Sequence, residues 1–210
     1  MPSIRSKACR MLTKYLVATR FNQNKTIGEL RRGTESLTKF SRLPSKTKVE
    51  KITFNSISAE WVYSYEAHQD RTILYLHGGG YNICSPNTHR VLAARISNAS
   101  GAKVILPEYR LAPEHPFPSA LEDATSAYRW LLDIGFTGEN IAIAGDSAGG
   151  GLSIATSISL RDAGDPLPAS LAIFSPWTDL EMSGNSIKTH AEIDPLVNLQ
   201  SLKIICAFSN

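Results

Sequence analysis

The sequence predicts an α/β fold in which a mostly parallel sheet carries helices on both faces. Short, predominantly apolar runs at residues 72–76, 103–106 and 141–144 are typical of strands buried on both faces. Helical stretches alternate with these runs, and glycines mark their ends. Such alternation is the pattern of a parallel sheet with crossover helices. A chain of 210 residues is long enough for one domain with a sizeable core.

Composition and cysteine usage set the broad class of protein. Apolar residues make up 42% of the chain and charged residues 20%, which is ordinary for a globular protein. No apolar run approaches the ~18 residues of a transmembrane helix, so we expect no stable membrane insertion. Cys9, Cys84 and Cys206 are too few for a disulfide framework. With no secretory signal recognisable at the N-terminus, they favour reduced thiols and a cytoplasmic location.

Charge is distributed unevenly along the chain. Residues 1–51 contain 13 Lys and Arg against 3 Asp and Glu, whereas the remainder contains 9 against 16. Such a basic segment binds an acidic partner, which would be a membrane surface, a nucleic acid or the acidic remainder of the chain. We favour docking within the chain and expect no nucleic acid partner.

The first 45 residues are expected to be helical. Apolar side chains recur at helical spacing over residues 3–20, and a weaker helical pattern covers residues 26–40 before Pro44. From Val49 onward the pattern changes to that of two antiparallel strands. We therefore divide the chain into an N-terminal helical segment, residues 1–45, and a core, residues 46–210.

The core is expected to continue as alternating strands and helices. The antiparallel pair spans residues 49–54 and 59–65, around Asn55-Ser56. Further strands are predicted at residues 72–76, 103–106, 141–144 and 171–174, and helices at residues 87–100, 119–134 and 147–163. The segment Pro107–Pro118 is too rich in proline for regular structure.

Residues 140–151 carry the first chemical signal. Gly145-Asp146-Ser147-Ala148-Gly149 fits the pattern G-x-S-x-G and stands between a buried strand and a helix. In such a turn the residues two positions from the serine must lack side chains, so that the serine Oγ is held clear of the backbone. The N-terminus of the following helix favours negative charge at the same point. The alternative is an ordinary glycine turn.

His77-Gly78-Gly79-Gly80 directly follows the predicted central strand and is the second signal. Consecutive glycines let backbone N–H groups turn inward with no side chain in the way. Two such donors, with the N–H of Ala148, are suited to bind the oxyanion of a tetrahedral intermediate. The alternatives are a flexible loop and a phosphate-binding loop, and no Gly-Lys-Ser/Thr ending supports the latter.

In their order, these motifs resemble the hormone-sensitive-lipase-like branch of the α/β-hydrolases, the bacterial carboxylesterases that include acetyl esterases and monoterpene lactone hydrolases. The resemblance is carried by His77–Gly80, Tyr109–Glu114 and Gly145–Gly150, with Ser175–Leu180 and Asp194–Leu196 as further matching segments. It implies an α/β-hydrolase fold that hydrolyses small esters or lactones through an acyl-enzyme, without a cofactor. The sequence itself has no Cys, His, Asp or Glu spacing typical of a metal site.

The resemblance also implies roles for individual residues. Ser147 would be the nucleophile, and His77 would orient the glycine loop. The oxyanion hole would be formed by Gly78, Gly79, Gly80 and Ala148, with Gly78 helping to shape the loop. Tyr109, Arg110 and Glu114 would brace the loops behind the site, and residues 1–45 would cap the acyl pocket.

The chain departs from the family at two places. Cys84 stands where the family usually has glycine, and its side chain would narrow the pocket mouth or act as a small hydrophobe. The family's triad acid and base would lie beyond residue 210, so we expect neither in this chain and the last strands of the sheet to be missing. We expect His115 and His190 to be poor substitutes for the base, and Asp146 to point away from the serine.

Three functions remain to be compared. We favour a serine carboxylic ester hydrolase acting through Ser147, impaired in this chain for want of the triad acid and base. The second is a non-catalytic binder of a small ligand on the same fold. The third is a basic arm, residues 1–51, that binds acidic lipid. The expected partner is a small ester or lactone, with a homodimer left open.

Overall fold

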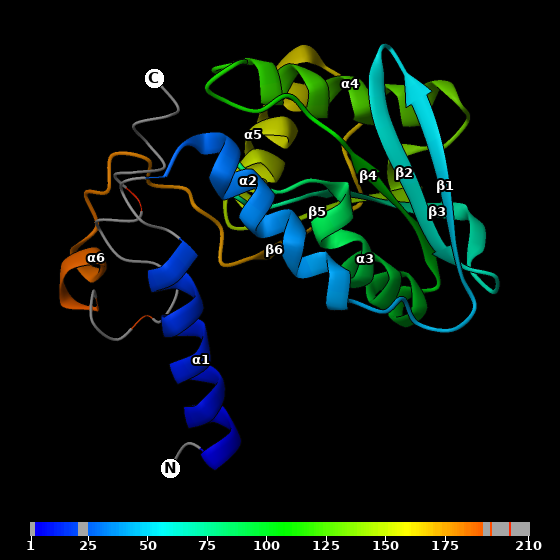
Figure 1. Ribbon diagram of the computed structural model, residues 1–210. Coiled ribbons are helices and arrows are strands. Elements are labelled where there is room, and N and C mark those ends of the chain that lie inside the picture. Colours follow the sequence, from blue (N-terminus) through cyan, green and yellow to red (C-terminus); the bar gives the residue numbers. More distant parts are fainter. Residues whose placement is uncertain (1–2, 21–24, 191–193, 195–201, 203–210) are drawn as a thin grey trace.

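A six-stranded sheet runs through the computed structural model, which describes residues 3–20, 25–190, 194 and 202 (Figure 1). The strand order across the sheet is β1-β2-β4-β3-β5-β6. The strands are β1 (Thr47–Phe54), β2 (Ile57–Ser64), β3 (His68–Leu76), β4 (Ala102–Pro107), β5 (Ile141–Asp146) and β6 (Ser170–Phe174). All the strands expected from the sequence are therefore present.

The sheet is antiparallel at one side and parallel elsewhere. β1 pairs with β2, and β2 with β4, in antiparallel register, whereas β4, β3, β5 and β6 pair in parallel. Asn55 and Ser56 join β1 to β2 with φ of 47° and 66°, the backbone twist that suits a two-residue hairpin. β3 starts earlier than expected, because a register shift between His68 and Thr72 lets its polar beginning join the sheet.

Helices cover both faces of the sheet, as expected. One face carries α3 (Pro86–Ser100), and the other carries α4 (Ser119–Asp133) and α5 (Ala148–Ala163). Alternate residues of β3 show the division: Leu74 and Leu76 pack in the core beneath α4 and α5, while Tyr75 joins the alanines of α3. The remaining short elements are η2 (Gly138–Asn140) and α6 (Asn185–Thr189).

The helix ends follow from local chemistry. Ser85 caps α3 through a capping box, and Pro86 occupies its first turn. Gly101 and Gly164 end α3 and α5 with φ of 68° and 76°, a left-handed conformation that glycine adopts without steric cost. These are the glycines at which the sequence predicted the helices to stop.

The N-terminal segment contains α1 (Ile4–Arg20), α2 (Ile27–Glu35) and the 3-10 helix η1 (Ser36–Phe40). The helix expected over residues 26–40 thus changes geometry at Ser36. α2 begins with a capping box between Thr26 and Glu29. Helices give way to strands between Phe40 and Thr47, close to the expected boundary at residue 45. The role of this segment as a cap stays a prediction.

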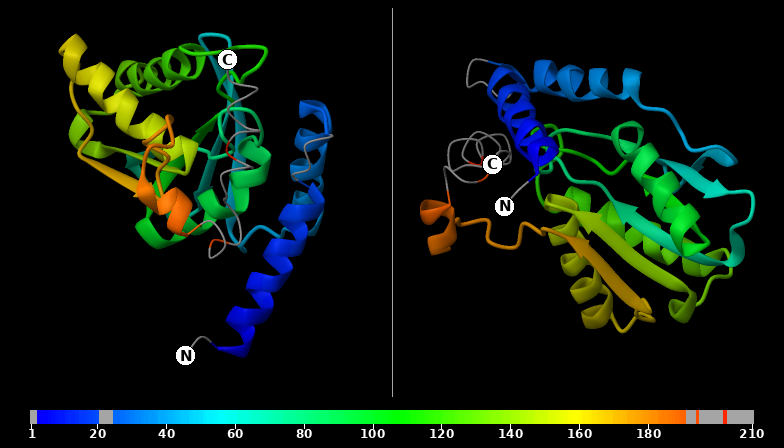
Figure 2. Two further views of the ribbon diagram at one scale, coloured as in Figure 1. Left: turned by 90° about the vertical axis from the view of Figure 1, so that its left-hand side faces the viewer. Right: turned by 90° about the horizontal axis from the view of Figure 1, so that it is seen from below.

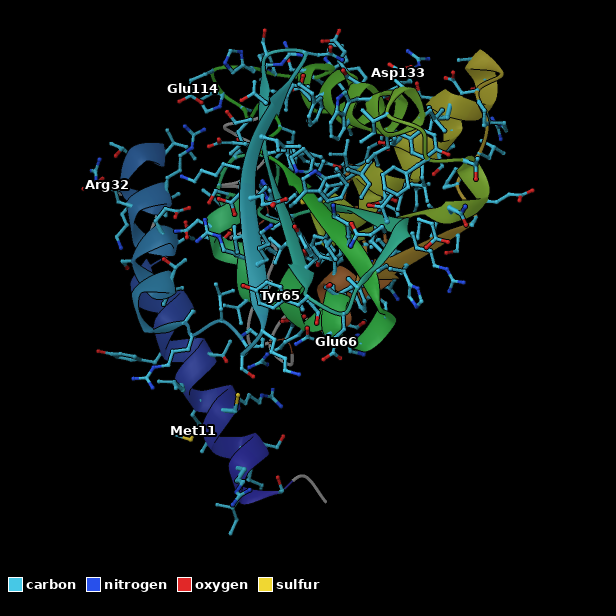
Figure 3. The ribbon with its side chains drawn as sticks, turned by 90° about the vertical axis from the view of Figure 1, so that its right-hand side faces the viewer. Met11, Arg32, Tyr65, Glu66, Glu114 and Asp133 are labelled. Atoms are coloured by element: carbon cyan, nitrogen blue, oxygen red, sulfur yellow. The ribbon has the colours of Figure 1, made fainter. Side chains whose placement is uncertain are left out.

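α1 does not lie on the sheet as expected of a docked basic segment. It extends away from the body of the molecule (Figures 1 and 2), and Figure 3 shows Met11 projecting from it. Its apolar stripe is largely exposed, from 59% at Leu12 to 87% at Ile4. Docking within the chain instead involves α2, through an ion pair of 2.7 Å between Arg31 and Glu114.

β6 forms the sheet edge opposite β1 in the described part of the chain (Figure 2). All its residues are exposed, including Leu171 at 40% and Phe174 at 53%. Among the described elements, β5 and α5 contact β6. No described strand pairs with the outer backbone edge of β6. This agrees with the expectation that the sheet has an open edge here.

Candidate active site

The two glycine motifs meet at the carboxyl ends of neighbouring parallel strands. Leu76 of β3 pairs with Gly145 of β5, so the glycine loop and the serine turn leave the sheet side by side. Ends of parallel strands in α/β folds are the usual position of functional sites. The topology therefore brings together segments that are 70 residues apart in the chain.

Ser147 occupies the strained turn that its motif predicts. Its φ is 51° and its ψ is −120°, a combination that costs a non-glycine residue on the order of 1–3 kcal/mol. The backbone holds this conformation: the N–H of Ser147 donates to Phe174 O at 3.0 Å, and its carbonyl accepts from Trp177 N at 2.8 Å. α5 begins at Ala148, and the half-buried serine does not use its hydroxyl as a helix cap.

Glycines are required in this turn because backbone atoms fill the space around them. A Cβ on Gly149 would lie 2.0 Å from Leu76 O, and a Cβ on Gly145 would lie 2.4 Å from Gly149 O. Either distance is far inside van der Waals contact. The first turn of α5 therefore packs directly on the backbone that leads into the glycine loop.

Three backbone N–H groups near the serine turn make no hydrogen bond within the described part of the protein. In the part of the chain that the structure describes, the N–H groups of Gly79, Gly80 and Ala148 donate to no protein acceptor. Gly79 and Gly80 have φ of 120° and 62°, which turns their peptide planes in ways that other residues rarely adopt. These amides are the ones that the sequence proposed for an oxyanion hole.

Gly78 requires a correction to that proposal. Its N–H donates to Oδ1 of Asp146 at 3.0 Å, so this amide is not free to hold an oxyanion. A Cβ on Gly78 would lie 2.2 Å from Oδ2 of the same carboxylate, which explains why glycine is needed. The Gly78 amide therefore joins the loop to Asp146 and is not available to bind an oxyanion.

Asp146 forms the centre of a polar cluster behind the turn. Besides Gly78, its Oδ1 accepts from the Tyr75 hydroxyl at 2.9 Å and lies 3.3 Å from Nε2 of His89. Burial opposes ionisation, but the hydrogen bonds from His89, Tyr75 and Gly78 outweigh it and hold the pKa of Asp146 below its ordinary value. The carboxylate makes no hydrogen bond to Ser147.

His77 is buried and neutral. Its ring stacks on Tyr109 with centroids 4.3 Å apart, and its Nδ1 lies 2.8 Å from Gly78 O. Burial, with the neighbouring His89 as a second cause, lowers the pKa of His77 to about 4. The Tyr109 hydroxyl donates to the His77 carbonyl at 2.6 Å. These contacts suit a residue that orients the loop, and His77 makes no hydrogen bond to Ser147.

The other histidines are also separate from the serine. All five histidines of the chain lie in the described residues, and none hydrogen-bonds to Ser147. His190 is exposed and pairs with Thr189, His115 is exposed, and His89 faces Asp146. The structure therefore gives no support to His190 or His115 as a catalytic base.

Cys84 has a backbone conformation that explains why glycine suits this position. Its φ is 71°, in the left-handed region. Burial raises the pKa of its thiol to about 12, so the side chain is a neutral thiol. The half-buried residue packs beside Gly79, and its properties fit a small hydrophobe better than a reactive group.

An apolar cavity of about 560 Å³ lies beside the serine turn. Tyr81, which follows the glycine loop, and Trp177, whose N–H donates to Ser147 O, both contribute to its wall. The two rings are 6.4 Å apart. Leu121, Leu152 and Phe117 also line the cavity. Its size and apolar lining are typical of a small-molecule pocket.

Sequence reasoning identified part of the bracing and missed the rest. Arg110 binds Asp123 through its guanidinium and its backbone N–H, and Glu114 pairs with Arg31. The expected bracing residues thus hold the loop at residues 107–118. No local pattern singles out Arg31 or His89, because each contacts a partner more than 50 residues away in the chain.

Two features are absent from the described residues. Groups of His, Cys, Asp or Glu arranged to bind a metal ion do not occur among them. In the same residues no helix combines the length and the apolar character needed to span a bilayer.

Comparisons with known proteins agree with the geometry. The sequence profile of a family described as alpha/beta hydrolase fold matches residues 73–209. An acetyl-hydrolase of Streptomyces hygroscopicus is 46% identical over 153 residues, which are 72% of this chain and 50% of that protein. An esterase of Acinetobacter venetianus is 33% identical over 138 residues, 66% of this chain and 46% of that protein.

Solved structures show the same similarity. An esterase from the bacterial hormone-sensitive lipase family superposes with a TM-score of 0.89 at 42% identity, covering 95% of this chain and 68% of its own. A hormone-sensitive lipase from a metagenome library superposes with a TM-score of 0.90 at 33% identity, covering 97% and 68%. The present chain thus spans about half the length of the curated relatives and about two thirds of these structures.

Proposed function

This chain belongs to the α/β-hydrolase family, and on that premise we propose that it is a serine carboxylic ester hydrolase with Ser147 as its nucleophile. The observation that carries the proposal is a strained serine beside uncommitted amides. Ser147 has φ of 51°, and the N–H groups of Gly79, Gly80 and Ala148 have no protein acceptor among the described residues. The relatives named acetyl-hydrolase and esterase support the same chemistry.

The reaction would proceed in two acyl-transfer steps. Ser147 Oγ attacks the carbonyl carbon of an ester or lactone, and its proton passes to a base. The carbonyl oxygen becomes an oxyanion that accepts hydrogen bonds from Gly79, Gly80 and Ala148, and each such donor is worth on the order of 10²–10³ in rate. The alcohol leaves with a proton, and water then hydrolyses the acyl-enzyme to the acid and free Ser147.

We propose that the 210-residue chain performs this chemistry slowly. A serine hydroxyl is a poor nucleophile without an adjacent base, and none of the chain's histidines bonds to Ser147. Oxyanion stabilisation and substrate binding alone retain only a residual acceleration over water. The nucleophile and the oxyanion donors are thus assigned to this chain, and the triad acid and base are not.

The proposed substrates are small. The cavity of about 560 Å³ beside Tyr81 and Trp177 supports a short acyl or alcohol group, because its size and mainly apolar lining suit a small apolar moiety. We also propose that residues 1–45 act as a cap on the core at residues 46–210. The ion pair between Arg31 of the first segment and Glu114 of the core supports this role as a cap.

Hydrolysis of p-nitrophenyl acetate and p-nitrophenyl butyrate tests the proposal. We expect slow turnover by the purified chain, and loss of that turnover in Ser147→Ala, because the acyl-enzyme cannot form. The matched control is Ser157→Ala, which removes a serine of the same helix away from the turn. An equal rate in Ser147→Ala would refute the nucleophile, and turnover at about 1–10³ per second would show that a base is present.

A non-catalytic binder of a small ligand remains a second candidate. The separation of every histidine from Ser147 favours it, whereas the uncommitted amides favour catalysis. Saturable binding of p-nitrophenyl butyrate with no turnover dependent on Ser147 would select the binder.

A further inference from the structure

Arg31 of α2 connects the N-terminal segment to two loops of the core. Its Nε donates to Asn82 O at 2.8 Å, and its Nη2 donates to Ala112 O at 2.9 Å. Both terminal nitrogens also bind Glu114, at 2.8 Å and 2.7 Å. The bidentate carboxylate fixes the plane of the guanidinium, and this leaves two N–H groups aimed at backbone carbonyls. One of these carbonyls belongs to the segment that follows the three glycines.

Glu35 makes a second attachment one helical turn further along α2. The Ser85 hydroxyl donates to its Oε1 at 2.6 Å, and the side-chain amide of Asn87 donates to its Oε2 at 2.7 Å. Residues 31 and 35 lie on the same face of the helix, because they are four positions apart. α2 therefore holds the glycine loop at Asn82 and again at its end, where α3 begins.

The loop has a strained residue directly before each of these attachments. Tyr81 and Cys84 have φ of 64° and 71°, although neither is glycine. Conformations of this kind cost a non-glycine residue on the order of 1–3 kcal/mol and persist only where surrounding contacts enforce them. The two attachments to α2 are contacts of that type, at Asn82 immediately after Tyr81 and at Ser85 immediately after Cys84.

Asn82 transmits the attachment to an oxyanion amide. Its N–H donates to Gly79 O at 3.1 Å, and its side-chain amide donates to Gly80 O at 2.9 Å. In a planar trans peptide the carbonyl and the following N–H point in opposite directions. Gly79 O faces Asn82, so the N–H of Gly80 in the same peptide plane points away from it. Arg31, through Asn82, thus fixes the direction of that N–H.

We propose that Arg31 is a positioning residue for the oxyanion loop, and that α2 serves as the outer scaffold of the site in addition to covering it. The importance of this role for ester hydrolysis rests on the proposed function. The positioning itself does not, because the orientation and protection of the loop amides are measurable in the absence of turnover.

Hydrogen–deuterium exchange of the loop tests the positioning. In Arg31→Ala we expect the amides of Asn82 and Ile83, which both donate to Gly79 O, to exchange about tenfold faster than in the unchanged chain, because the loop opens locally without its attachment. The control is Arg32→Ala, which removes the neighbouring arginine on the outer side of α2 (Figure 3). Arg31→Lys is the second variant: it keeps the charge for Glu114 but lacks the planar donors, and should also exchange faster.

Two further readouts separate positioning from a general loss of stability. Adding about 10 mM guanidinium, a concentration far below that of denaturation, should restore part of the protection in Arg31→Ala and leave Arg32→Ala unchanged. Where Ser147-dependent turnover is measurable, kcat should fall with KM unchanged, because the oxyanion donors act in the transition state.

The proposal is overturned if Arg31→Ala and Arg32→Ala show the same exchange at the amides of Asn82 and Ile83. It is equally overturned if exchange in Arg31→Ala rises throughout the chain in proportion to the loss of global stability. Failure of the proposed function has a different signature: turnover would be unaffected by Ser147→Ala, while the effect of Arg31 on exchange would persist.

Discussion

The amide of Gly78 donates to Oδ1 of Asp146 at 3.0 Å, so the residue before Ser147 holds the first of the three glycines. The side chain of Asp146 thereby joins the serine turn to the glycine loop. The same oxygen receives the Tyr75 hydroxyl and faces His89. This carboxylate oxygen therefore has three polar partners.

Asp146→Asn should destabilise the protein by about 1–3 kcal/mol, because charge-assisted hydrogen bonds to a partly buried carboxylate are replaced by weaker ones. Urea denaturation monitored by circular dichroism measures the loss. The control is Asp165→Asn, which affects a surface pair with Arg129 and should change the free energy of unfolding by less than about 1 kcal/mol. Equal losses in the two variants would mean that the Asp146 cluster contributes no more than a surface ion pair.

His77 should make the protein less stable as the pH falls from about 6.5 to 4. Its folded pKa is about 4 and its unfolded value about 6.5, so in this window the unfolded chain binds a proton that the folded chain does not. The stabilisation is complete above pH 6.5, and roughly 3 kcal/mol of it is lost below pH 4.

Urea denaturation at a series of pH values measures this effect. His77→Gln should be less stable at pH 7 but have a flatter dependence on pH, because glutamine does not titrate. His68→Gln, which changes an exposed histidine, should keep the slope of the unchanged chain. If all three proteins share one slope between pH 6.5 and 4, His77 is not neutral in the folded state.

Gly149→Ala should destabilise the protein by at least about 3 kcal/mol, because its Cβ would lie 2.0 Å from a backbone carbonyl that cannot move aside. Gly33→Ala is the matched change in α2, where a Cβ meets nothing within 4 Å, and should stabilise the protein by about 0.5–1 kcal/mol. Thermal and urea unfolding of both variants decide the matter. A mild effect of Gly149→Ala would imply that the first turn of α5 can shift away from β3.

Cys84 should react with iodoacetamide at least about 100-fold more slowly than Cys9 in the folded protein at pH 8, because its thiol is partly buried with a pKa of about 12. Cys9 is exposed on α1. Mass spectrometry of the two peptides after timed labelling gives the ratio. Labelling in 8 M urea is the control, and there the two rates should converge. Comparable rates in the folded protein would place the Cys84 thiol in solvent.

Much of the fold was predictable because its signals are local. The buried strands, the helix stops at Gly101 and Gly164 and the turn at Ser147 each depend on a few adjacent residues. The early start of β3 was missed, since only its pairing with Ala102 makes the polar residues around His68 a strand. The exposed stripe of α1 was missed for a similar reason: helical spacing defines a face but not what covers it.

The residues of the candidate site were likewise predictable only in part. Ser147 and the three glycines are recognisable from their motifs, whereas the commitment of the Gly78 amide to Asp146 appears only once β3 and β5 are paired. Arg31 is a more extreme case. It lies in a basic segment with many similar residues, and its partner Glu114 is 83 positions away. Neither charge nor periodicity distinguishes it from Arg32.

The contact between Gly149 and the backbone at Leu76 and His77 limits which amino-acid substitutions the protein tolerates. At that point the serine turn packs on the main chain that leads into the glycine loop, and any side chain at position 149 would push the two segments apart. The spacing of these segments therefore depends on glycine at that position, whereas the side chains of Tyr81 and Trp177 in the cavity wall lie outside this contact. Substitutions in the side chains that line the cavity can therefore alter substrate preference without disturbing the backbone contact at Gly149.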